Sequence, residues 1–216
     1  MKLVIQLLLW IVIFFLGYLV FNSVYGPVQF NEVKEKRYAK VIERLKDIRA
    51  AQLAHQEVTG TFAKDFNGLV QFIDTAEYVL TQRRDSTVLD EEYKKTYGVD
   101  QYKDIIIIDT LGYASVKDSL FKRSNYREMM NVPVDGIDAK FEMDAGTVLK
   151  NDNKIPVFEA KVDKAVILHD QDKDLVMQEK QVVSVDQVNG AFIKVGSMEE
   201  VNTNGNWPQV YGANDQ

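Results

Sequence analysis

The chain has 216 residues, of which 46% are apolar and 27% are charged, and it contains no cysteine. This composition is typical of a chain with a packed core, and the formal net charge of −6 argues against a nucleic-acid-binding protein, whose surface is usually basic. The absence of cysteine excludes disulfides, a catalytic thiol, Cys-based zinc or iron–sulfur sites and a lipid-modified cysteine.

The first element in the chain is an apolar segment from Leu3 to Val20, in which Gln6 is the only polar residue. A helix of this length is about 27 Å long, close to the ~30 Å hydrocarbon core of a bilayer. We therefore predict a transmembrane anchor over residues 1–25. Representative side chains of this anchor are Leu3, Leu8, Trp10, Phe14 and Leu19.

A cleaved signal peptide is the alternative interpretation of this segment. Such a peptide has an apolar region of about 7–15 residues and then a small-residue cleavage site, whereas this run is longer and is followed by FNSVYG. The flanking charges indicate the orientation only weakly, because Lys2 precedes the span and a mixture of basic and acidic residues follows it. The short tail before the anchor favours a single-pass protein of the bacterial inner membrane with its soluble domain in the periplasm.

Residues 26–75 are predicted to form an amphipathic helix and a helical turn. Gly26 and Pro27 are expected to break or kink the chain after the anchor, because proline removes a helix donor and crowds the preceding turn. A helix is then expected from Glu32 to about Val58. One apolar stripe runs along it at spacings of three and four: Tyr38, Val41, Ile42, Leu45 and Ile48. This stripe is expected to pack against the protein's own sheet, to form a seam for a partner helix, or to do both, because a small head covers only part of a helix about 40 Å long.

The stretch around His55 ends this helix. Gly60 is a natural helix stop, and Phe62 and Phe66 are expected to return the chain onto the helix. A second short helix is predicted from about Phe66 to Thr75. Because no second histidine and no cysteine lies at a useful spacing from His55, packing is favoured over catalysis for this stretch.

Residues 76–134 are predicted to be a charged linker that contains one buried strand. The segment 81–104 is highly charged and is expected to be a solvated loop with a helix near Leu89–Tyr97. Residues 105–108 form a continuous isoleucine run, which is typical of a buried strand. The segment 110–133 shows no regular period.

From residue 135 to 201 the apolar period changes to two, which predicts an antiparallel β domain. KFEMDAGTV and PVFEAKVDKAVIL are expected to form a hairpin, and LVMQEKQVVSV and GAFIKVGS two further strands, in one sheet of four or five strands. Residues 202–216 are rich in turn formers and are predicted to be a flexible tail. The fold class is therefore α+β, in which a transmembrane helix and a long amphipathic helix precede a mostly antiparallel β-sheet head.

One cluster has the residue types of a metal site, namely His169 with Asp170, Asp172 and Asp174. Its D-x-D-x-D spacing is similar to that of a calcium loop, but Leu175 and the glutamine at position 181 replace the glycine and the glutamate that such a loop requires. A polar hairpin tip is the favoured interpretation, and no metal or cofactor is predicted. Because the chain also lacks nucleophile and phosphate-loop motifs, we do not predict an enzyme.

The layout of an apolar helix, a proline, an amphipathic continuation and an antiparallel sheet resembles that of type IV pilins and type II secretion pseudopilins. Six residues in IRAAQLAHQEVTGTFAKDFNGL carry the resemblance: Ala50, Ala51, Gly60, Phe62, Asp65 and Leu69. It covers about residues 1–75 and implies a pilin-like head on a long helix. The basic leader with a glycine and the glutamate near the start of the apolar run, which are typical of that family, are replaced here by Lys2 followed directly by Leu3. The chain also resembles single-pass envelope proteins of Bacteroidota.

These observations lead to a functional expectation with two alternatives. We expect a structural or accessory subunit of a cell-envelope complex for secretion, motor or transport activity. Its partners would be the lipid bilayer and other membrane or periplasmic proteins, in a homo- or hetero-oligomer, and nucleic acid is not expected. The alternatives are a pilin-like fibre subunit and an envelope module that binds a ligand or metal.

Overall fold

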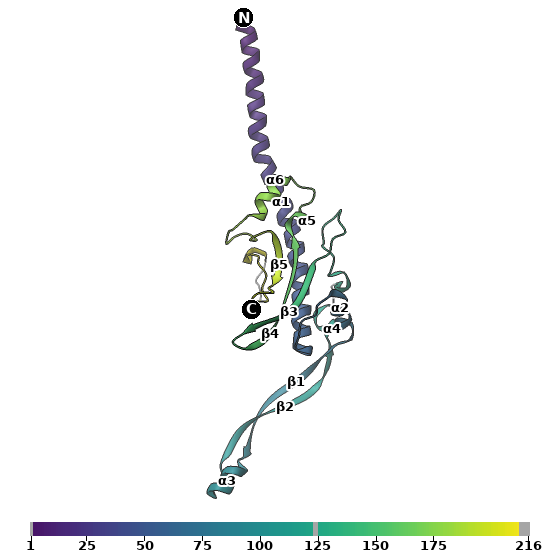
Figure 1. Ribbon diagram of the computed structural model, residues 1–216, viewed down its shortest axis with the longest axis vertical. Coiled ribbons are helices and arrows are strands. Elements are labelled where there is room, and N and C mark those ends of the chain that lie inside the picture. Colours follow the sequence, from purple (N-terminus) through teal and green to yellow (C-terminus); the bar gives the residue numbers. More distant parts are fainter. Residues whose placement is uncertain (1, 123–124, 212–216) are drawn as a thin grey trace.

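The computed structural model describes residues 2–122 and 125–211 and has the predicted α+β fold. One long helix carries a head built from short helices and a three-stranded antiparallel sheet, and a two-stranded antiparallel arm leaves the far end of that head (Figure 1). The apolar core of the head lies between the second half of the long helix, the helices beside it and the larger sheet.

The long helix, α1 (Lys2–Thr59), passes through two environments. Its described side chains are exposed as far as Tyr25, and an 18-residue window near its start has a mean hydropathy of 2.7. The helix is therefore long and apolar enough to cross a membrane. From Phe30 onward one face of the same helix is buried beneath the head. The predicted stripe lies on this face, and all of its members are at most 1% exposed: Tyr38, Val41, Ile42, Leu45 and Ile48.

Of the break or kink expected at Gly26 and Pro27, the break is wrong, because α1 continues through both residues as one helix (Figure 1), and the kink stays a prediction. A proline inside a helix removes one backbone hydrogen bond and costs roughly 3 kcal/mol. The long helical segments on both sides of Pro27 maintain the helix here. Prolines are also tolerated inside membrane-spanning helices. The anchor and the stem of the head are consequently one continuous element.

The chain turns back onto α1 as the sequence predicts. Gly60 has a φ of +79°, a conformation that glycine adopts without strain, and its N–H bonds to the carbonyl of Gln56 at 2.8 Å. Gln52 then holds both backbone groups of Ala63, at 2.8 and 2.9 Å. Helix α2 (Phe66–Thr75) follows, with the predicted bounds.

The segment predicted to be a charged loop forms most of a β arm, so that prediction is wrong. Strand β1 (Glu77–Leu89) pairs with β2 (Tyr102–Ser115), and α3 (Glu91–Tyr97) closes the tip near the predicted helix. The isoleucine run is a strand, as expected, but it is not buried: Ile106 and Ile108 are 52% and 66% exposed. Their cross-strand partners are Asp85 and Arg83, and no second layer covers the ribbon in Figure 1.

The larger sheet contains β3 (Glu142–Lys150), β4 (Asn153–Asp163) and β5 (Phe192–Gly196) in that order, which makes three strands where four or five were expected. The predicted β3–β4 hairpin is present, with Asn151 and Asp152 at positive φ in its turn. The inward side chains of β4 are buried, as its alternation indicates: Phe158, Ala160 and Val162.

Two segments after β4 differ from their predictions. The expected strand near LVMQEKQVVSV is largely the helix α6 (Lys173–Lys180), which is preceded by the short α5 (Lys164–Ile167). The predicted flexible tail is packed in its described part, where Trp207 is only 5% exposed and the short 3-10 helix η2 (Gln209–Tyr211) follows. Residues 212–216 of that tail lie outside the described part of the chain. Between β2 and β3 lie α4 (Val116–Leu120) and the 3-10 helix η1 (Tyr126–Glu128).

Candidate interaction surfaces

The apolar first part of α1, which is the candidate membrane span, presents its described side chains outward. The predicted anchor residues are between 45% and 78% exposed: Leu3, Leu8, Trp10, Phe14 and Leu19. Exposure of such residues around a whole helix is unfavourable in water and favourable in lipid. A lipid bilayer is therefore a compatible surrounding for this part of α1.

The candidate metal cluster is engaged in contacts within the protein. Asp170 accepts two hydrogen bonds from the guanidinium of Arg37 on α1, at 2.6 and 2.7 Å. This pairing holds the pKa of Asp170 well below its ordinary value. Asp172 is the N-cap of α6, where it accepts from the backbone N–H groups of Asp174 and Leu175.

The four candidate residues are therefore not brought together as ligands. Within residues 2–122 and 125–211, no three His, Cys, Asp or Glu side chains are placed to hold one metal ion. A cation at this loop would have to displace Arg37 from Asp170, so the geometry does not favour the ligand- or metal-binding alternative.

His55 also makes contacts within the protein, at the end of α1. Its Nδ1 lies 2.6 Å from the carbonyl oxygen of Thr61 and 3.0 Å from Oγ1 of Thr59, which in turn bonds the His55 carbonyl at 2.7 Å. The ring packs against Phe72 with the centroids 4.7 Å apart. These contacts close the C-terminal end of α1 and fix α2 beside it.

A buried charge network joins the stem to the head, and no pattern in the sequence pointed to it. The carboxylate of Glu179 on α6 accepts hydrogen bonds from Lys34 at 3.0 Å, from Lys164 at 3.1 Å and from the Tyr38 hydroxyl at 3.3 Å. Lys164 is fully buried and also donates to the carbonyls of Glu179 and Val188. Burial lowers the pKa of Lys164 and raises that of Tyr38.

The β1–β2 arm presents many exposed apolar side chains. Ten of its large apolar side chains are between 39% and 68% exposed: Val79, Leu80, Tyr93, Tyr97, Val99, Tyr102, Ile106, Ile108, Leu111 and Tyr113. Its two strands form a sheet of their own, so each has a free edge. A long two-stranded ribbon is marginally stable alone in water, and an exposed apolar edge is prone to pair with another chain. The arm is thus a candidate protein-binding surface.

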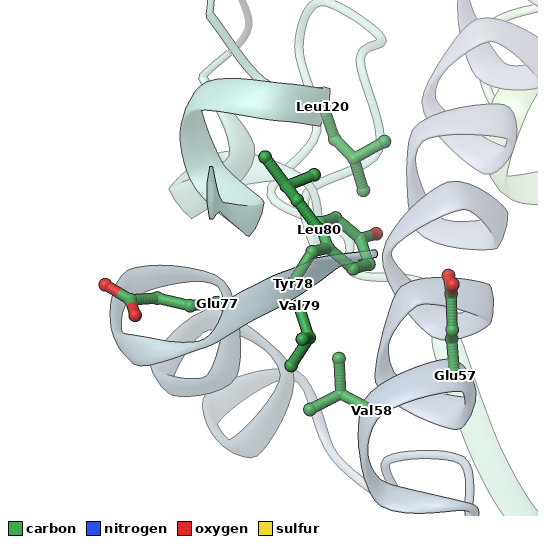
Figure 2. Close-up of a pocket in the computed structure, with 7 residues that line it drawn as sticks. All are labelled: Glu57, Val58, Glu77, Tyr78, Val79, Leu80 and Leu120. Atoms are coloured by element: carbon green, nitrogen blue, oxygen red, sulfur yellow. The ribbon is translucent and has the colours of Figure 1, made fainter. Parts of the chain in front are cut away.

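A groove of about 600 Å³ lies where the arm meets the end of α1 (Figure 2). Its apolar side chains come from three elements: Val58 of α1, Tyr78, Val79 and Leu80 of β1, and Leu120 of α4. Figure 2 shows Glu57 on the α1 side of this apolar patch and Glu77 on the other side. The groove therefore combines an apolar floor with two carboxylates.

Comparison of the chain with protein-family models, with curated proteins and with solved structures gave no match.

Proposed function

We propose that this chain is a single-pass inner-membrane protein whose head lies in the periplasm and which acts as a structural or accessory subunit of a cell-envelope complex. Secretion, motor and transport assemblies are the classes of complex that it would serve. In this role the membrane segment fixes the subunit in the bilayer and the arm binds a protein partner.

The observation that carries this proposal is the continuity of α1. One helix holds both the apolar exposed segment and the buried stem, so the head has a fixed position relative to the anchor. The arm leaves the opposite end of the head and points away from the N-terminus (Figure 1). A subunit of this shape can hold a binding surface at a set distance from a membrane, which is a structural task and requires no catalytic group.

Photocrosslinking in intact cells tests the proposed partner surface. A photoreactive amino acid at Ile108 of the arm is compared with one at Met177 of α6, because the two positions are similarly exposed at 66% and 62%. We expect an adduct with a specific protein from Ile108 and none from Met177, and mass spectrometry identifies the partner. A chain that gives no arm adduct and elutes as a lone monomer from mild detergent would contradict the proposal.

The location is tested separately by fractionation and cysteine labelling. The sequence contains no cysteine, so a single Asp118→Cys or Lys95→Cys change gives one reporter thiol. In intact spheroplasts a membrane-impermeant maleimide should label both variants, because both positions lie in the proposed periplasmic part. Labelling only after the inner membrane is lysed would place the head in the cytoplasm.

A pilin-like fibre subunit is the second candidate, and the arrangement of α1 favours it. The resemblance stated above implies a pilin-like head on a long helix, and here the apolar start of α1 is exposed while its second half is buried beneath a head with an antiparallel sheet. The intact mass of the protein from its native membrane distinguishes the two candidates. Loss of an N-terminal leader would favour the fibre subunit, whereas a full-length chain would oppose it.

A further inference from the structure

We propose that the groove between α1 and the arm binds the β3–β4 turn of a second copy of this chain. This inference deepens the proposed function, on which it rests, because it names a second copy as one partner of the anchored subunit. The contact joins two different surfaces of the same protein, so each copy offers one groove and one turn.

The groove has the composition of a binding surface for a basic, apolar loop. Three of its apolar side chains are 44%, 47% and 41% exposed, namely Val58, Leu80 and Leu120. The side-chain carboxylates of Glu57 and Glu77 have no hydrogen bond or ion pair within the described residues, and both residues are exposed. Lys117, the cation on the same short helix as Leu120, is directed elsewhere, with its Nζ 5.9 Å from the centre of the Tyr126 ring.

The β3–β4 turn has the complementary composition. Leu149 is 65% exposed and lies directly opposite Lys154 in the hairpin, so the two side chains share one face. Lys150 lies at the next pair, and Asp152 is the one carboxylate in residues 149–154. The ammonium groups of both lysines have no hydrogen bond or ion pair with another described residue. The ammonium group of Lys154 lies on the same face as Leu149, and Lys150 adds a second positive charge on the opposite face of the same turn. An apolar side chain at a basic turn matches an apolar floor with two carboxylates beside it.

The placement of these two surfaces suits copies that are anchored in the same membrane. Figure 1 shows the β3–β4 turn and the end of α1 at a similar level along the long axis. The turn lies on one side of α1, and α2 and α4 lie on the other (Figure 1). Two parallel copies standing side by side can therefore bring the turn of one to the groove of the next without shifting either anchor.

A contact between two different surfaces is repeated from copy to copy. It forms a ring when the rotation between copies closes and an open row or filament when it does not. Because the copies at the two ends of an open row each keep one unused turn or groove, crosslinking at this contact should give a ladder of products and not a dimer alone.

Disulfide crosslinking of the full-length chain in membranes tests the contact, with no native cysteine to interfere. The paired variant is Val58→Cys/Leu149→Cys, and its matched control is Val58→Cys/Val185→Cys, since Val185 is 92% exposed but follows α6 at the other end of the head. We expect a ladder of dimers, trimers and larger products from the first and not from the second. A mixture of the two single variants, Val58→Cys and Leu149→Cys, should stop at the dimer.

Charge reversal tests the carboxylate–lysine pairing independently. Glu57→Lys/Glu77→Lys and Lys150→Glu/Lys154→Glu should each lower the crosslinked fraction about fivefold, as expected for losing roughly 1 kcal/mol of exposed pairing. Combining all four reversals restores opposite charges across the contact and should restore the ladder. Lys95→Glu/Lys173→Glu changes the net charge as much as the lysine reversal and should have no effect.

Several results would overturn the contact with a second copy. The crosslinking results that would do so are a ladder no stronger than that of the control pair, a product that stops at the dimer for the paired variant, or crosslinks from Val58→Cys to other proteins only. The same holds if the variant that combines all four charge reversals gives a crosslinked fraction as low as that of either double reversal. Fluorescence of buried Trp207 shows that each variant is folded. If the arm still crosslinks to a partner and the chain remains in the membrane fraction, the contact alone has failed; if both are lost, the proposed function has failed.

Discussion

Glu179 is the residue on which the junction of stem and head depends most. Its carboxylate is 5% exposed and is shared by two lysines and a tyrosine that come from α1 and from the start of α5. Because two cations meet one anion, the site already carries an excess of positive charge, and burial lowers the pKa of Lys164. Removing one partner of a buried ion pair typically costs about 3–5 kcal/mol.

We therefore expect Glu179→Gln to destabilise the head by about 3 kcal/mol, because Lys34 and Lys164 would remain buried without a carboxylate. Urea unfolding followed by Trp207 fluorescence measures the effect, in a Trp10→Phe background that leaves one tryptophan of the two. Glu200→Gln, at an exposed position, is the control and should change the free energy of unfolding by less than about 0.5 kcal/mol. Equal effects of both changes would show that the network does not hold the junction.

The Arg37–Asp170 pair should make the head sensitive to acid. The pKa of Asp170 is lowered in the folded protein by its bonds to Arg37, so the carboxylate binds a proton more readily after unfolding. Its contribution is therefore fully present above the ordinary value of 3.8 and is lost as the pH falls below that value. We expect Asp170→Asn to cost at most about 1 kcal/mol at pH 7, since Asp170 is 45% exposed, and to cost progressively less from pH 4 to pH 2. If Asp170→Asn lowers the free energy of unfolding by the same amount at pH 4 and at pH 2, this assignment is contradicted.

At the scale of elements, local sequence patterns correctly predicted α2, β4 and the apolar stripe on α1. The bounds of α2 follow from its apolar spacing and the stop at Gly60, and β4 follows from the strict alternation of Phe158, Ala160 and Val162. The stripe on α1 was found for the same reason, but the sequence left open what covers it, because its own head and a partner helix require the same spacing. Burial under the head answers that question.

The elements that differ from their predictions depend on contacts between distant parts of the chain or on signals outside the local apolar pattern. The arm was missed because polar partners such as Arg83 and Asp85 lie opposite Ile108 and Ile106, which hides the strand period on β1. Helix α6 was missed because its valine and leucine suggested a strand, although the cap at Asp172 was a usable signal. The Glu179 network and the groove could not be predicted, since each joins side chains from elements that are distant in the chain.

Strand β5 offers a prediction about close packing at the end of an element. Gly196 has a φ of +76°, and a Cβ atom there would lie 2.2 Å from the carbonyl oxygen of Phe158 on β4. Gly190 has nearly the same φ of +77° but open space around it. Gly190→Ala should therefore cost only the strain of the conformation, about 1 kcal/mol, whereas Gly196→Ala should cost at least 2 kcal/mol more, because β4 and β5 must separate. Thermal unfolding of the two variants measures the difference, and equal losses would contradict the contact.

At the scale of the whole molecule, the packed core and the proposed partner-binding surface lie in different parts. The core cluster contains no residue between Ile73 and Val116, so the arm adds nothing to it beyond the packing of Ala76 and Tyr78 at its base. The exposed apolar residues outside the membrane segment are, by contrast, concentrated on the arm. A ribbon that contributes little to its own fold and remains exposed is explained if its function is to bind another protein.

This separation predicts the outcome of shortening the arm. Replacing residues 84–107 with Asn-Gly joins Arg83 to Ile108, which are directly paired in the ribbon, through a two-residue turn that suits an antiparallel hairpin. The head should keep its thermal unfolding midpoint within about 2 °C, because no core residue is removed, and fluorescence of Trp207 should be unchanged. The partner adduct at the arm should disappear, whereas the ladder through Leu149 and Val58 should persist because neither surface includes the deleted residues. A large loss of head stability would mean that the arm is part of the folding unit, and the arm would then no longer be a surface whose exposure is explained by binding alone.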